Sequence, residues 1–95
     1  MDDLIAVYEF CVNHHIEISF ITLLQQNGLI EIKTIESKYF VEKEQLPKLE
    51  KFVRFYYDLD INLEGIEAIT YLLQRIENLQ NEIVALKNRL GLYEG

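Results

Sequence analysis

The sequence predicts a mainly α-helical domain with a small β-hairpin and a long C-terminal coiled-coil helix. Three patterns support this fold class. Apolar residues recur at helical spacing over residues 4–26 and again over 45–59. Between them, residues 30–41 alternate apolar and charged side chains, as a half-buried strand does. From residue 69 to residue 90, isoleucine and leucine recur in alternating steps of three and four.

The N-terminal segment is predicted to form two short helices joined by a tight turn. Leu4-Ile5 is expected to be extended, and a helix then continues to about Asn13. A turn at His14-His15 precedes a second helix over residues 17–26. Asn27-Gly28 ends that helix, because glycine adopts the left-handed conformation that a helix C-terminus often needs. The result is a helix-turn-helix outline.

A β-hairpin is predicted next. Ile30 and Ile32 alternate with charged residues, and the β-forming run Tyr39-Phe40-Val41 follows. The turn is expected near residues 35–38.

The rest of the chain is predicted to be helical. A third helix begins at Gln45, where Pro47 suits a first turn because its missing N–H is not needed there. This helix ends near Asp58, and residues 60–62 form an elbow before the long helix.

The long helix is predicted from Leu63 to Leu90. The expected organisation is a body over residues 1–61 and a long helix over 62–95, together one compact unit. We define the seam as the residues at heptad positions a and d: Ile69, Leu72, Ile76, Leu79, Ile83, Leu86 and Leu90. Isoleucine at a with leucine at d favours two-stranded pairing, so we expect a homodimer. Folding of the seam onto its own domain is the alternative, and the helix orientation stays open.

Charge argues against nucleic acid and lipid as partners. The net charge is −7, and residues 1–32 contain no lysine or arginine. Phosphate contacts, which lysine and arginine supply, provide much of the affinity for nucleic acid. An acidic surface of this kind is attracted to basic proteins, and the alternative is that the acidity serves only to keep the protein soluble.

A soluble, cytoplasmic protein is expected. Met1 is followed by two aspartates, where a signal peptide needs positive charge. The longest uncharged stretch, residues 18–30, is too short and too polar to span a bilayer. The single cysteine, Cys11, permits no internal disulfide, which fits a reducing compartment.

No catalytic site, metal site or cofactor is predicted, and we expect no enzyme. His14 and His15 are adjacent and make a poor metal pair, and Cys11 is expected to be buried and inert. The aromatic residues of 52–57 lie close to Lys48, Lys51 and Arg54, a combination that can stack and hold nucleic-acid bases. Because these aromatic residues recur at helical spacing, we expect them to pack in the core instead.

The order of elements resembles the MerR family of winged helix-turn-helix regulators. The resemblance rests on Asn27-Gly28-Leu29-Ile30 after the second helix and on the run from Leu59 to Ile66 at the elbow. Where that family carries arginines before the glycine, this chain reads Thr22-Leu23-Leu24-Gln25-Gln26. Tyr39 stands where a wing arginine usually holds a phosphate.

A narrower resemblance is to the chaperone modulatory protein CbpM family. It is carried by Glu9-Phe10-Cys11, by residues 27–31, and by residues 58–66 followed by the long helix. This resemblance implies binding to the J-domain of a DnaJ-like co-chaperone, CbpA, and restraint of its activity. A MerR-type DNA-binding regulator is the alternative, and a structural coiled-coil adaptor is a third reading.

Composition suggests where a basic partner docks. Four carboxylates lie in or close to the elbow, on both sides of it, and we call them the acidic elbow: Asp58, Asp60, Glu64 and Glu67. We expect their charge to steer docking more than to fix affinity.

Overall fold

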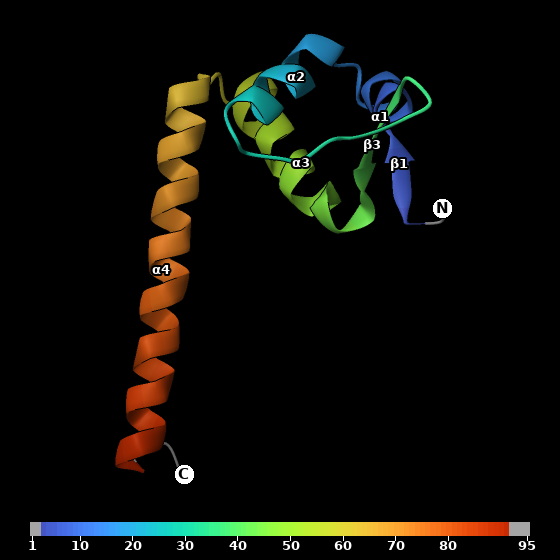
Figure 1. Cartoon of the computed structure of the whole chain (residues 1–95). Coiled ribbons are helices and arrows are strands. Elements are labelled where there is room, and N and C mark those ends of the chain that lie inside the picture. Colours follow the sequence, from blue (N-terminus) through green and yellow to red (C-terminus); the bar gives the residue numbers. More distant parts are fainter. Residues whose placement is uncertain (1–2, 92–95) are drawn as a thin grey trace. The chain divides into compact units, whose positions relative to one another are not determined.

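The computed structural model describes residues 3–91 and confirms the predicted fold class. The chain forms two compact units, a body that ends at Leu63 and a C-terminal unit that begins at Glu64. Figure 1 shows the body as short helices around a small sheet and the C-terminal unit as one helix.

The body begins with the predicted helix-turn-helix. Strand β1 (Leu4–Ala6) leads directly into α1 (Val7–His14), and α2 is Ile18–Gln26. Both helices end in a left-handed residue, His15 after α1 and Gly28 after α2. After α2, the Leu29 N–H donates to Leu24 O at 2.9 Å and the Gly28 N–H donates to Gln25 O at 3.0 Å. This pair of bonds is a Schellman ending, so the predicted stop at Asn27-Gly28 is confirmed.

The hairpin is formed by β2 (Lys33–Ile35) and β3 (Lys38–Glu42), which pair antiparallel. Its start differs from the prediction, since Ile30 and Ile32 lie outside the strands. The sequence patterns also did not include β1 in the sheet. β1 pairs antiparallel with β3 and gives the order β1-β3-β2.

The two turn residues of the hairpin, Glu36 and Ser37, both have positive φ, at 52° and 67°. Such a turn favours Asn-Gly. Replacing Glu36→Asn together with Ser37→Gly is therefore expected to raise the free energy of unfolding by about 1 kcal/mol, because the strain at two left-handed residues is relieved. Urea denaturation measures this change. An unchanged or lower free energy of unfolding would contradict the turn geometry.

The third helix starts with a 3-10 turn at Lys43–Gln45, continues as α3 (Leu46–Val53) and ends in a π-helical turn, η2 (Arg54–Asp58). Pro47 lies in its first turn, as predicted. The apolar helical spacing of residues 45–59 predicts that Leu59 packs inward with the rest of that face, and this is wrong, because Leu59 is 58% exposed. The π-helical turn that ends at Asp58 changes the helical spacing before Leu59, and the left-handed backbone of Asp60 follows directly after it.

The core of the body is apolar and draws on every major element. Its buried side chains are Val7, Phe10, Cys11, Phe20, Ile21, Leu24, Ile30, Val41, Leu49 and Phe52. Leu23 belongs to the apolar helical spacing of residues 4–26, but its side chain is exposed, because it lies about 200° around α2 from Ile21.

The long helix α4, Leu63–Leu90, has the predicted bounds, and from Glu64 onward it forms the C-terminal unit. Six seam residues, from Leu72 to Leu90, have side chains between 48% and 67% exposed, and Ile69 is half-buried. Within residues 3–91, no helix is both long enough and apolar enough to cross a bilayer.

Candidate functional site

The outer face of α2 is the surface that a helix-turn-helix offers to a partner. The inner face of α2 is buried through Phe20, Ile21 and Leu24. The exposed side chains on the rest of the helix are all uncharged: Ile18, Ser19, Thr22, Leu23, Gln25 and Gln26. This face offers apolar contacts and neutral hydrogen bonds, and it has no cation for a phosphate.

A small hollow of about 130 Å³ separates α2 from the hairpin wing. Its lining is neutral and comprises Thr22, Gln25, Ile32, Thr34 and Tyr39. Tyr39 pairs with Thr34 across β2 and β3, so the sheet fixes its position. The residue at the expected phosphate-holding position is thus an exposed phenol, with no positive charge.

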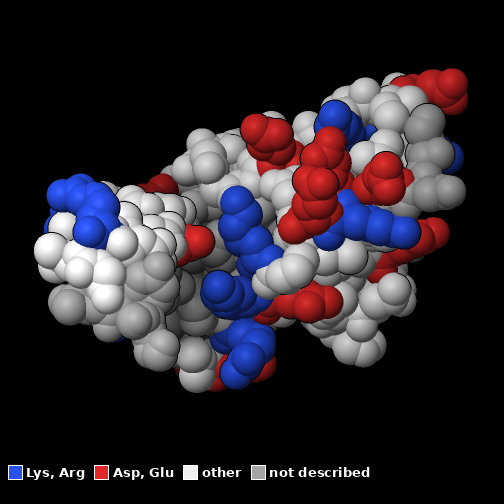
Figure 2. Space-filling model, turned by 90° about the horizontal axis from the view of Figure 1, so that it is seen from below, with Lys and Arg blue, Asp and Glu red and all other residues white. Residues whose placement is uncertain are grey.

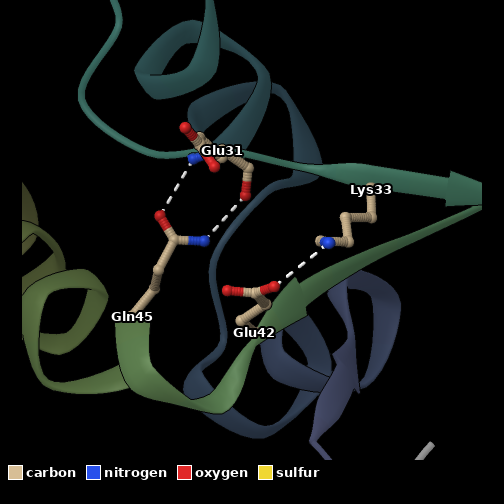
Figure 3. Close-up of polar contacts among 4 residues, drawn as sticks. All are labelled: Glu31, Lys33, Glu42 and Gln45. Carbon is tan, nitrogen blue, oxygen red and sulfur yellow. Dashed lines mark hydrogen bonds and ion pairs between the residues drawn. The ribbon is translucent and has the colours of Figure 1, made fainter.

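Three polar contacts between two pairs of residues hold the wing in place (Figure 3). The Gln45 side chain accepts a hydrogen bond from Glu31 N at 2.9 Å and donates one to Glu31 O at 2.8 Å. The amide therefore satisfies both backbone groups of Glu31, as a neighbouring strand would, just before β2 begins. The Lys33 ammonium lies 3.1 Å from the Glu42 carboxylate, so the first lysine of the chain is already paired within the wing.

The basic residues of the third helix do not form a single-sign patch. Lys48, Lys51 and Arg54 are exposed, and so are Glu44 and Glu50. Figure 2 shows basic side chains gathered in a short strip with acidic side chains next to them. A surface of mixed sign attracts nucleic acid weakly.

The nearby aromatic residues pack with one another. Phe52 is buried, which confirms the core reading for that residue. The Phe20 ring lies 4.6 Å from the Tyr56 ring and 5.4 Å from the Tyr57 ring. These rings stabilise the contact between α2 and the π-helical turn, and are not arranged as a free stacking surface.

The acidic elbow is divided between the two units. Asp58 and Asp60 are exposed in the body, and Asp60 has a φ of 57°. Asp60 lines an open hollow of about 370 Å³ together with Tyr56 and Tyr57. Glu64 is exposed and Glu67 is half-buried, both on α4.

Comparison with known families agrees with this geometry. The family model described as "MerR HTH family regulatory protein" matches residues 5–88, which include the helix-turn-helix, the wing and nearly all of α4. The chain belongs to the MerR HTH family. Members of this regulatory family are generally non-enzymatic. Comparisons with curated proteins and with solved structures gave no match.

Sequence reasoning missed one feature of this MerR-family body. A hollow of about 520 Å³ lies among α1, the start of α2 and the wing, with Tyr8, Ile18 and Tyr39 in its lining. These residues come from three separate segments, and no motif links them in the sequence. The only sequence signal was a tyrosine at the wing position where the family usually has arginine.

His14 packs against its neighbours in this MerR-family chain. His14 stacks on Phe10 with ring centroids 4.0 Å apart, and its Nδ1 lies 3.1 Å from Phe10 O. Its Nε2 lies 3.9 Å from the Glu50 carboxylate. Among residues 3–91, no three His, Cys, Asp or Glu side chains are grouped to hold a metal ion.

Cys11 is buried, and this burial raises the pKa of its thiol. Because the thiolate is the nucleophile, we expect iodoacetamide to label native protein at least about a hundredfold more slowly than urea-unfolded protein. Labelling should accelerate as the pH rises toward the raised pKa. Mass spectrometry over time gives both rates, and similar rates would contradict the burial of this thiol.

Proposed function

We propose that the protein is a non-enzymatic modulator that inhibits a DnaJ/CbpA-like co-chaperone by binding its basic J-domain. The absence of lysine and arginine from residues 1–32, the segment that supplies the helix-turn-helix, carries this proposal. The exposed face of α2 is uncharged as well. A DNA reader needs cations on that face to contact phosphates, whereas a protein-binding domain does not.

Charge complementarity supports a basic partner. The net charge of −7 gives an attractive long-range field toward a basic helix, and such fields raise association rates. In the proposal, the acidic elbow steers the J-domain, with Asp58 and Asp60 contributing from the body and Glu64 and Glu67 from α4. Apolar contacts then provide most of the affinity.

The proposal includes a homodimer formed through the seam. Six seam side chains are about half exposed or more in the single chain, and together they make a continuous apolar stripe. Exposed stripes of this kind mark protein–protein contacts. A second copy supplies a matching stripe, since the heptad pattern is the same on both helices. The proposed compartment is the cytoplasm, where the unpaired Cys11 stays reduced.

The test is calorimetric titration with a purified J-domain at increasing salt. The variant Asp60→Asn with Glu64→Lys is expected to bind about tenfold more weakly at low salt, with a smaller difference at high salt. Asparagine is chosen at residue 60 because it tolerates the left-handed backbone there. The matched control, Glu44→Gln with Glu77→Lys, changes the net charge equally at exposed positions elsewhere. Affinity that ignores both salt and the elbow substitutions would refute electrostatic docking.

A MerR-type DNA-binding transcription regulator is the second candidate, because membership of the MerR HTH family is compatible with either function. It would use the exposed cations Lys48, Lys51 and Arg54. Gel-shift assays with random duplex DNA at low salt separate the two candidates. Under the leading proposal no shift is expected, whereas a shift that fades as salt increases would support the DNA-binding regulator.

A further inference from the structure

The hollow among α1, α2 and the wing is lined mainly by apolar and aromatic side chains. Tyr8 is 67% exposed, Tyr39 is 55% exposed and Ile18 is 43% exposed. With Val7 and Phe40 they line a hollow of about 520 Å³. This volume lies within the range of about 300–1,000 Å³ typical of binding pockets.

Backbone pairing makes the hollow a preformed feature. Ala6 pairs with Phe40 across β1 and β3, and α1 begins at the residue after Ala6. The pairing therefore brings Tyr8, in the first turn of α1, close to Tyr39 on β3. Helix α1 also contacts α2, which begins with Ile18. Because three paired or packed elements fix the lining, little conformational entropy is lost when a partner docks.

Charge around the hollow indicates the character of its occupant. Glu9 belongs to the lining, and the exposed Glu17 immediately precedes Ile18. Both helices that border the hollow lack lysine and arginine. On the wing side, Lys38 provides the positive charge of the lining. A partner segment is thus offered apolar contacts flanked by carboxylates on the helical side.

We propose that this hollow docks an amphipathic helix of the partner protein, with apolar side chains inserted between Tyr8 and Tyr39. Lysine or arginine side chains of that helix lie over Glu9 and Glu17, on the helical side. An amphipathic helix in an apolar groove is a common recognition mode, and exposed tyrosines are frequent binding anchors. This inference rests on the proposed function. It assigns the apolar contacts between the protein and the J-domain to the hollow.

Substitution of the two tyrosines tests the apolar part of the proposal. Tyr8→Ala with Tyr39→Thr is expected to weaken binding of a purified J-domain at least about tenfold in calorimetric titration. Alanine suits the helix and threonine suits the strand, so the secondary structure is preserved. The matched control is Tyr71→Ala, because Tyr71 is 61% exposed on α4 and lies outside the seam. The control should bind like the wild type.

Two charge substitutions test the orientation of the partner helix. Glu9→Lys is expected to weaken binding about tenfold, whereas Lys38→Glu is expected to strengthen it about threefold, because it removes repulsion of a basic helix. These opposite changes in affinity are expected only if the docked helix is basic. Weaker binding by Lys38→Glu and stronger binding by Glu9→Lys would mean an acidic occupant and would overturn the proposal.

The outcomes separate this inference from the proposed function. If wild-type protein does not bind the J-domain, the proposed function fails. If the J-domain binds wild-type protein and the Tyr8/Tyr39 variant equally, docking in the hollow fails while the proposed function stands. If the tyrosine variant is monomeric under conditions where wild-type protein is dimeric in sedimentation, the hollow is a contact between copies and the inference is wrong.

Discussion

Replacing both Ile76 and Ile83 by aspartate is expected to convert the proposed homodimer into a monomer. Both residues occupy heptad position a, and each is about half exposed in the single chain. In a paired seam, each aspartate would bury a carboxylate without a partner, which costs several kcal/mol. The dimer dissociation constant should increase by at least about a thousandfold. Analytical ultracentrifugation over a range of concentrations measures the change.

The matched control for the seam is Asn81→Asp with Asn88→Asp. These residues lie on the same helix, add the same charge and occupy outward positions of the heptad. The control protein should remain dimeric. Pairing through the seam would be contradicted if the aspartate variant and the control were both dimeric, or if the wild-type protein were monomeric.

Truncating Phe52 to alanine is expected to destabilise the body more than any other single change considered above. Phe52 is 1% exposed and is one of the largest fully buried side chains. Replacement of a buried phenylalanine by alanine lowers the free energy of unfolding by about 3–5 kcal/mol, because it loses apolar contacts and leaves a cavity. The total for a domain is about 5–15 kcal/mol, so this loss is a large fraction of the stability of the body.

Urea denaturation followed by circular dichroism measures this loss. Phe55→Ala is the matched control, since Phe55 lies in the adjoining π-helical turn and is only half-buried. Its loss should be less than half as large. Equal losses for the two variants would show that Phe52 does not anchor the core.

The helices were predictable because their signals are local. The heptad pattern extends to Leu90, the elbow over residues 60–62 places the start of α4 at Leu63, and Gly28 marks the end of α2. Each signal depends on residues within a few positions of one another. The pairing of β1 with β3 could not be predicted from the sequence. A strand of three residues has almost no periodicity, and α1 and α2 lie between β1 and β3 in the chain. The contact between Gln45 and Glu31 was hidden for the same reason.

Only part of the candidate site could be predicted from the sequence. The uncharged face of α2 follows directly from its composition, because a missing charge can be read without knowing the fold. The hollow cannot be found in this way. Tyr8, Ile18 and Tyr39 belong to three segments that only the sheet and the helix packing bring together. Their exposure also depends on which neighbours cover them, as the unexpected exposure of Leu23 and Leu59 illustrates.

The pairing of β1 with β3 has a consequence for the order of folding. Strands β2 and β3 are joined by a two-residue turn, so their hairpin can form within microseconds. Pairing of Leu4 with Glu42 instead closes a loop that contains α1, α2 and β2. Closing that loop loses chain entropy before the core contacts compensate, so docking of β1 is expected to be the slow step for the body. The hollow, which depends on this pairing, is then completed only at that last step.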